Sequence, residues 1–289
     1  MGDVIEIFGN STIQHGKHSD RVYLMSLSTG DLPDVLNHLD ALAETRDYSK
    51  IFAKVPAAVS AVFMENGYTN EATVPGLLNG EEGLFMGKYL SAKRKEEGRS
   101  DLVREVLAAA QAKACTQPDL ALPSTFTCRR TRPEEAEEMA ELYRQVFATY
   151  PFPIQDPAYL VETMESHVHY YAIREEGELV ALASAEMDQK GLNAEMTDFA
   201  TLPESRGKGL ANCLLAKMEE DILDLGIKTA YTIARAYSHG MNITFAKNGY
   251  EFCGTLTNNT DISGGLESMN VWFKPLETEA GEVALAEGQ

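Results

Sequence analysis

The chain has 289 residues, of which 44% are hydrophobic and 24% charged, so it can bury a packed core and disorder is not indicated. Its formal net charge of −19 argues against nucleic acid or an anionic membrane surface as the main partner. No apolar run reaches about 18 residues, and the N-terminus lacks a basic segment followed by an apolar one. We therefore expect a cytoplasmic protein with no membrane span.

The first 115 residues alternate strand and helix patterns, which predicts an α/β domain. Strands are predicted at 4–8, 22–27, 48–55, 68–74 and 84–90, and helices at 32–42, 57–66 and 100–115. The residues after position 8 have the pattern of a polar turn. Residues 116–124 contain Pro118 and Pro123 and are predicted to be a linker.

A second domain is predicted from 125 to 276, followed by an acidic tail at 277–289 that we expect to be frayed. Its strands are predicted at 126–130, 168–175, 178–188, 192–201, 229–234, 250–256 and 268–274. Its helices are predicted at 132–148, 156–166, 210–225 and 241–248. His167 and His169 begin one strand, but no third ligand stands at a useful spacing, so we expect no metal.

The stretch from 192 to 226 combines a strand, a glycine-rich turn and an amphipathic helix. Pro203 ends the strand, apolar residues recur at helical spacing from Leu210 to Leu225, and Gly226 stands where a C-terminal cap belongs. Such a turn presents unpaired N–H groups at the positive end of a helix, and glycines let the backbone approach a phosphate. We interpret it as a cradle for a diphosphate. The cradle residues are Arg206, Gly207, Lys208, Gly209, Leu210 and Ala211.

The spacing within this turn distinguishes between known phosphate-binding motifs. A P-loop has a different spacing and a Ser or Thr after its Gly-Lys pair, and the dinucleotide fingerprint needs a glycine where this chain has Asn212. The pattern R-x-x-G-x-A at Arg206, Gly209 and Ala211 instead resembles motif A of the GNAT acetyltransferase superfamily. The resemblance implies acetyl-CoA as co-substrate and a GNAT fold, an α/β fold whose central twisted mixed sheet is flanked by helices.

A weak internal repeat links the two halves of the chain. The segment 61–68 (AVFMENGY) echoes 244–250 (TFAKNGY), and the helix–strand pair at 32–55 mirrors the pair at 210–234. The N-terminal half thus resembles a truncated copy of the acetyltransferase core. Because it lacks the R-x-x-G-x-A turn, we assign it no coenzyme and expect it to pack against the second half or shape its cleft.

Acetyl transfer to an amine requires a base, because a lysine-type ammonium has a pKa of about 10.4 and must first lose a proton. Glu195, on the strand before the turn, is our candidate, since a carboxylate on a central strand is costly unless it is paired or functional. Strand alternation is expected to place Thr197 and Phe199 on the face of Glu195. Asp198 would lie on the other face, unless a bulge reverses the register and lets it act through a water. Glu186 suits a substrate ammonium.

The resemblance also implies where the thioester oxygen lies. Main-chain N–H groups near Ala200, Thr201 and Leu202 are expected to donate to this oxygen, on which negative charge develops. Backbone donors have no signature of their own in a sequence, so this assignment depends on the family.

The following helix departs from the family pattern. Superfamily members carry an asparagine near pantetheine and a tyrosine as general acid, and this chain has Ser238 and Phe245 at those places. Because Phe245 cannot donate a proton, Tyr237 or Tyr231 must serve, or the thiolate departs directly. We expect Asn242 to be a polar contact near the coenzyme or part of the helix surface.

Three longer phrases resemble one subfamily, the β-lysine N-acetyltransferases: AEMTDFATLPESRGKG, YTIARAYSHGMN and ESMNVWFKPL. The resemblance implies acetylation of the ε-amine of β-lysine, which forms the compatible solute Nε-acetyl-β-lysine. A diamino acid needs acids for its second ammonium, for which Glu186 and Asp198 are candidates, and a cation for its carboxylate, for which Arg235 is one. Tyr150 and Phe152 fall where relatives form the acceptor wall.

Two other functions remain open at this point. The chain could acetylate a polyamine or a protein lysine; an open, shallow groove would favour a protein, and a closed acidic pocket a diamine. It could also be a non-catalytic coenzyme A-binding module, which the phenylalanine at 245 keeps open. A small-molecule amine is the expected partner, and a homodimer is left open.

Overall fold

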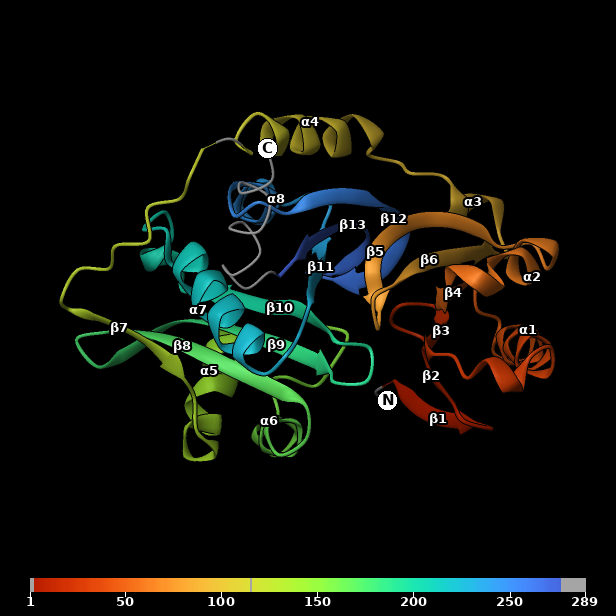
Figure 1. Cartoon of the computed structure of the whole chain (residues 1–289), viewed down its shortest axis with the longest axis horizontal. Coiled ribbons are helices and arrows are strands. Elements are labelled where there is room, and N and C mark those ends of the chain that lie inside the picture. The colour runs from red at the N-terminus through yellow and green to blue at the C-terminus, as the bar shows by residue number, and fades with distance from the viewer. Residues whose placement is uncertain (1–2, 115, 277–289) are drawn as a thin grey trace, which may run out of the picture.

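The computed structural model describes residues 3–114 and 116–276. Its strands join in one mixed sheet with the order β1-β2-β3-β4-β6-β5-β12-β13-β11-β10-β9-β8-β7, and helices lie against both halves of the sheet (Figure 1). The fold is α/β, as the sequence predicts. The described residues include no helix that is long and apolar enough to cross a membrane. The predicted tail and the predicted helix end at 115 lie outside these residues.

The strands of the N-terminal half are β1 (Val4–Phe8), β2 (Ser11–Gly16), β3 (Arg21–Ser26), β4 (Lys50–Pro56), β5 (Thr69–Leu78) and β6 (Glu81–Tyr89). Its helices are α1 (Asp34–Arg46), α2 (Ser60–Glu65), α3 (Ala92–Lys95) and α4 (Ser100–Gln111). The strands of the second half are β7 (Phe126–Arg130), β8 (Val168–Glu175), β9 (Glu178–Asp188), β10 (Asn193–Thr201), β11 (Thr229–Arg235), β12 (Glu251–Ile262) and β13 (Gly265–Pro275). Its helices are α5 (Ala136–Val146), α6 (Pro157–Met164), α7 (Leu210–Asp224) and α8 (His239–Lys247).

The two halves of the sheet repeat one topology. From β1 to β6, the strand order and directions match those from β8 to β13, and each half includes a parallel pair, β3–β4 or β10–β11. In each half one helix connects the parallel pair, α1 or α7, and a second helix, α2 or α8, follows it. The N-terminal half has no counterpart of β7, α5 and α6 among the described elements, which agrees with a truncated copy. The domain boundaries themselves remain a prediction.

Helices α1 and α2 cover one face of the N-terminal half, and its opposite face meets the second half. Val22 and Ile51 belong to the apolar cluster that packs against α1 and α2. Their neighbours Tyr23 and Phe52 belong to a different cluster, which also contains Tyr231 of β11. Successive side chains of a strand point to opposite faces. The face of the N-terminal half that is opposite to α1 and α2 therefore packs against the second half.

Strands β5 and β12 join the two halves at the centre of the sheet, where Ala72 pairs with Gly254. The approach is close, because an added Cβ on Gly254 would lie 2.1 Å from the carbonyl oxygen of Glu71. The Glu71 carboxylate accepts a hydrogen bond from the Thr257 N–H at 2.8 Å and pairs with the Lys50 ammonium at 2.8 Å. Polar contacts of the Glu71 carboxylate therefore help to fix the N-terminal half relative to the second half.

Strands β2 and β12 differ most from the prediction. The predicted polar turn after position 8 leads directly into β2, and β12 extends to Ile262 rather than ending at 256. Ser11, Gln14 and His15 of β2 are buried, and His15 Nδ1 lies 3.1 Å from the Tyr48 hydroxyl. The N-terminal half stabilises the extension of β12, because Arg94 Nε donates to the Asn258 carbonyl of β12 at 2.7 Å. Contacts distant in sequence stabilise both strands, so a local pattern does not reveal them.

Candidate functional site

Strands β10 and β11 lie side by side for only a short stretch. Their parallel pairing runs from Asn193–Thr229 to Glu195–Tyr231 and then stops. Strand β10 stays paired with β9 as far as Thr201. The two parallel strands therefore separate beyond Glu195, and a gap opens between them.

Two cavities share these separating strands. The inter-repeat cavity, of about 340 Å³, is lined by residues of both halves and includes Thr197 of β10 and Ile233 of β11. The turn cleft, of about 600 Å³, lies over the glycine-rich turn and includes Thr201 of β10 and Arg235 of β11. Both volumes are typical of small-molecule sites, which span roughly 300–1,000 Å³. Since each strand contributes to both walls, the gap between β10 and β11 lies between the two cavities.

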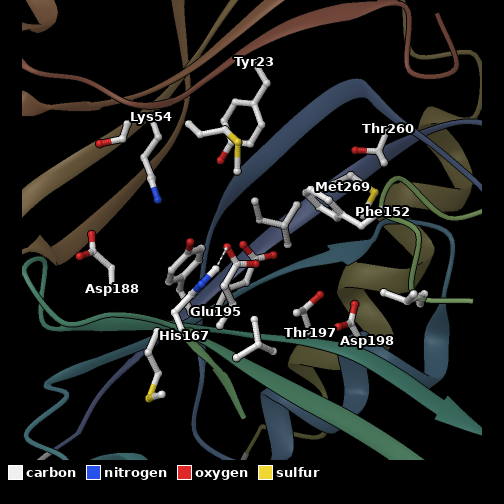
Figure 2. Close-up of a pocket in the computed structure, with 18 of the residues that line it drawn as sticks. Tyr23, Lys54, Phe152, His167, Asp188, Glu195, Thr197, Asp198, Thr260 and Met269 are labelled. Atoms are coloured by element: carbon white, nitrogen blue, oxygen red, sulfur yellow. Dashed lines mark ion pairs between the residues drawn. The ribbon is translucent and has the colours of Figure 1, made fainter. Parts of the chain in front are cut away.

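Glu195 projects into the inter-repeat cavity (Figure 2). Burial raises the pKa of Glu195 to about 8, and the negative charge of Glu186 adds to this rise. The Lys54 ammonium and a hydrogen bond from Tyr231 lower the pKa but are outweighed. A carboxylate whose pKa lies near the working pH is suited to be a general base.

Asp198 lines the same cavity as Glu195. A β-bulge at 197–200 interrupts the pairing of β10 with β9, and Asp198 has a left-handed φ of 56°. The prediction of opposite faces is therefore wrong, and the register reversal considered as its alternative occurs. The Tyr150 hydroxyl donates to Asp198 Oδ1 at 2.5 Å, and the Ser184 hydroxyl donates to Oδ2. Burial raises the pKa of Asp198 to about 6, against the opposing effect of these hydrogen bonds.

The predicted acceptor residues Glu186, Tyr150 and Phe152 all line the inter-repeat cavity. Glu186 Oε1 lies 3.6 Å from His167 Nε2, and this carboxylate raises the pKa of His167. The sequence presents His167 as an ordinary polar residue, but Figure 2 shows it in the cavity wall. His167 and Glu186 thus lie in the same cavity as Tyr150 and Phe152.

The N-terminal half forms the opposite wall of this cavity. Tyr23 of β3 and Phe52 and Lys54 of β4 line it, and Figure 2 shows Lys54 projecting from this half toward the strand that carries Glu195. No motif in the sequence marks these three residues. The first half therefore shapes the cavity that holds the candidate base.

The glycine-rich turn has the backbone of an anion site. Gly207 and Gly209 have φ values of 79° and 78°, in the left-handed region, and Gly209 is the N-cap of α7. The first N–H groups of a helix lack intrahelical partners, and the helix dipole favours negative charge beside them. Arg206 and Lys247 line the same cleft, and Arg206 Nε donates to the Thr201 carbonyl at 3.2 Å.

The predicted coenzyme residues divide into two groups. Those that line the turn cleft are Thr201, Arg206, Gly207, Gly209, Leu210, Ala211 and Ser238. Among the others, the Leu202 N–H donates to the Val180 carbonyl at 3.0 Å, so it is already used. The Lys208 ammonium pairs with Glu175 at 2.9 Å. The Leu202 N–H and the Lys208 ammonium are thus engaged within the protein, while a role of the Lys208 main chain in the turn stays a prediction.

Ala200, Asn242 and Phe245 belong to the protein core. The fully buried Asn242 accepts a hydrogen bond from Trp272 Nε1 at 2.9 Å. Phe245 is 1% exposed and packs edge-on against Phe199, which the bulge turns toward α8. For Asn242 and Phe245, these contacts favour packing roles over the predicted roles in coenzyme binding, and the main-chain role of Ala200 stays a prediction.

Tyr237 forms a hydrogen bond, and Arg235 an ion pair, with a glutamate outside the inter-repeat cavity. The Tyr237 hydroxyl donates to Glu97 Oε1 at 2.8 Å, and Tyr237 lines neither cavity. Arg235 pairs with Glu267 at 2.6 Å in the wall of the turn cleft. These placements support neither Tyr237 as general acid nor Arg235 as ligand of an acceptor carboxylate. Tyr231, the other candidate acid, lines the inter-repeat cavity.

Three comparisons relate the chain to known proteins. Residues 136–250 match the Acetyltransferase (GNAT) family. Beta-lysine N(6)-acetyltransferase of Methanococcus maripaludis is 39% identical over 274 residues, which cover 95% of this chain and 99% of the relative. Beta-lysine N(6)-acetyltransferase of Methanosarcina mazei is 42% identical over 155 residues, which cover 54% and 57%. The solved ribosomal-protein-S18-alanine N-acetyltransferase from Escherichia coli is similar to 55% of this chain over 98% of its own length, with 13% identity and a TM-score of 0.47.

Proposed function

The chain belongs to the acetyltransferase (GNAT) family, and from this premise we propose that it transfers the acetyl group of acetyl-CoA to the N6 amine of β-lysine. The observation that carries the proposal is the position of Glu195, at the end of the β10–β11 pairing and in the wall of the inter-repeat cavity. An amine bound in this cavity lies beside the Glu195 carboxylate, whose pKa is raised. The turn cleft lies on the other side of the gap between β10 and β11. The acceptor and the coenzyme thus meet between the two strands.

The diphosphate of acetyl-CoA binds at the turn between 206 and 211 in this proposal. The left-handed glycines, the start of α7 and two cations in the wall, Arg206 and Lys247, suit an anionic group. An added Cβ on Gly207 would meet no atom within 4 Å, so the turn leaves room for a ligand. The residues present therefore fit the coenzyme, which supplies the thioester.

Glu195 accepts the proton that the substrate ammonium must lose before its nitrogen can attack. Tyr231 lines the same cavity as this carboxylate and lowers its pKa. Asp198 already accepts hydrogen bonds from Tyr150 and Ser184, which suits it to position Tyr150 in the acceptor wall. We assign no general acid, because Phe245 lies in the core and Tyr237 lies outside both cavities.

The test is an acetylation assay with β-lysine, lysine, spermidine and a lysine peptide, read by thiol release and by mass spectrometry of the product. We expect the highest kcat/KM for β-lysine, with the acetyl group on N6. A higher value for spermidine or for the peptide would favour a polyamine or a protein acetyltransferase. No turnover with any acceptor would favour the non-catalytic module. The compatible-solute role of the product and the cytoplasmic location stay predictions.

Glu195→Gln should lower turnover with β-lysine by roughly 10²-fold or more, because glutamine cannot accept the proton. Affinity for acetyl-CoA, measured by calorimetry, should be retained because Glu195 is not in the turn cleft. Glu178→Gln is the matched control, since Glu178 is exposed at the start of β9 and lines neither cavity. Unchanged turnover in Glu195→Gln would remove this residue from the mechanism.

A further inference from the structure

The inter-repeat cavity combines acids from one half of the chain with a lysine from the other. Glu186, Asp188 and Glu195 come from β9 and β10 of the second half, whereas Lys54 comes from β4. Carboxylates suit the ammonium groups of a diamine. A lysine serves no such purpose, because it repels them.

Lys54 differs from the other cations of this cavity in having no partner among the residues that the structure describes. The Arg21 guanidinium donates to the Asn259 carbonyl at 2.6 Å and to the Thr260 hydroxyl at 3.0 Å. His167 lies 3.6 Å from Glu186. Within residues 3–114 and 116–276, Lys54, a residue of intermediate exposure in the cavity wall, forms neither a side-chain hydrogen bond nor an ion pair.

An ammonium in a cavity wall that no opposite charge compensates is available to bind an anion. Lys54 stands close enough to Glu195 for its charge to lower the pKa of that carboxylate, although burial outweighs it. Lys54 lines the same cavity as Glu195 and projects toward the strand that carries it (Figure 2), so the lysine faces the region where the reacting amine must lie. Arg235, the cation that the sequence suggested for a substrate carboxylate, is bonded to Glu267 in the other cavity.

We propose that Lys54 is the specificity-determining residue that binds the carboxylate of the acceptor, so that the site selects a diamino acid over a polyamine. The inference rests on the proposed function and adds to it the residue that makes the choice. In this arrangement the acceptor lies between the halves, with its carboxylate at Lys54 on β4 and its reacting amine at Glu195 on β10. The N-terminal half, which has no coenzyme turn, thereby takes part in substrate recognition.

The test compares Lys54→Met with the unaltered protein on two acceptors, β-lysine and 1,4-diaminopentane. The second acceptor is β-lysine with its carboxylate replaced by hydrogen, so it keeps both amines at the same spacing. We expect Lys54→Met to lower kcat/KM for β-lysine on the order of 10- to 100-fold, as for a lost hydrogen-bonded charge pair. The value for 1,4-diaminopentane should stay the same or rise. Lys54→Arg should restore part of the activity on β-lysine.

Lys93→Met is the matched control, because Lys93 is an exposed lysine of the same half and lines neither cavity. Thermal unfolding of each variant checks that the fold is intact. An equal loss on both acceptors, with a shifted pH profile, would mean that Lys54 acts through Glu195 and would overturn the inference. Unchanged kcat/KM for β-lysine would overturn it as well.

The failure of the proposed function has a separate signature. If the unaltered protein transfers no acetyl group to β-lysine, the proposed reaction is wrong, whatever Lys54 does. Calorimetric binding of β-lysine to the unaltered protein and to Lys54→Met then decides the inference on its own. Binding that weakens in the variant supports a carboxylate site at Lys54, and binding that is absent or equal in both overturns it.

Discussion

Glu195 keeps its proton to a higher pH in the folded protein than in the unfolded chain. Its pKa is about 8 in the fold, whereas a free glutamate has a pKa of about 4.3. Between these two values the folded state holds a proton that the unfolded state has released. The free energy of unfolding therefore falls as pH rises through this window, and the loss is complete above the folded pKa.

Glu195→Gln should consequently raise Tm, and by more at about pH 9 than at about pH 5. Glutamine cannot ionise, so the variant escapes a loss on the order of 1 kcal/mol or more. Thermal unfolding of both proteins across this range measures the difference. A gain of equal size at every pH would contradict the raised pKa. The residue that limits stability would thus be the one that activity requires, a common trade-off.

Two glycines with nearly equal φ values flank helix α7, Gly209 before it and Gly226 after it. They provide a matched test of the coenzyme turn. Gly209→Ala places a side chain at a φ of 78°, which costs about 1–2 kcal/mol. The turn must shift to relieve this strain, so KM for acetyl-CoA should rise several-fold while KM for the acceptor changes little. Steady-state kinetics with each substrate varied in turn measure the two constants.

Gly226→Ala is the control for this prediction. Gly226 follows the other end of α7 with a φ of 83°, and an added Cβ would meet no atom within 4 Å. The backbone cost should be similar, but KM for acetyl-CoA should not change. A similar rise in both variants would mean that general destabilisation, rather than the turn, causes the effect.

Strands that are defined by neighbouring residues could be predicted from the sequence. Features that depend on contacts far along the chain, or on a bulge, could not. The bounds of β8 and β9 match the prediction because a tight turn and an apolar pattern define them. Strand β2 was missed because its buried polar groups bond to residues far along the chain. The face of Asp198 was predicted wrongly because a bulge leaves no clear mark in the residue pattern.

The junction between the halves should control the acceptor site. Gly254→Ala would bring a Cβ within 2.1 Å of the Glu71 carbonyl oxygen and 2.8 Å of Ala72 Cα. The strands must separate, which should cost about 1–3 kcal/mol and displace Lys54 relative to Glu195. We expect a lower Tm and a higher KM for β-lysine, with KM for acetyl-CoA less affected.

Gly265→Ala is the control for the junction, because a Cβ there would meet no atom within 4 Å although it lies on the neighbouring strand β13. Thermal unfolding and acceptor kinetics of both variants give the comparison. If Gly254→Ala lowers Tm but leaves KM for β-lysine unchanged, the acceptor site does not depend on the junction.

The whole cavity could not be predicted from either half of the sequence. Glu195 and the glycine-rich turn belong to one local pattern, so the residues themselves indicate a coenzyme and a base. Tyr23, Phe52 and Lys54 lie on strands that any α/β domain would contain. Their role depends on which face of one repeat meets the other, and that is decided by long-range packing such as the Ala72–Gly254 pairing.

Because the two repeats are fused in one polypeptide, the acceptor site does not depend on protein concentration for its assembly. If the same two walls belonged to separate subunits, they would dissociate at low protein concentration, and acceptor recognition would be lost with them. A covalent tether instead keeps the partners at an effective concentration on the order of millimolar. Activity per molecule can therefore persist at any enzyme level, while the repeat without a coenzyme turn is free to evolve toward a different acceptor.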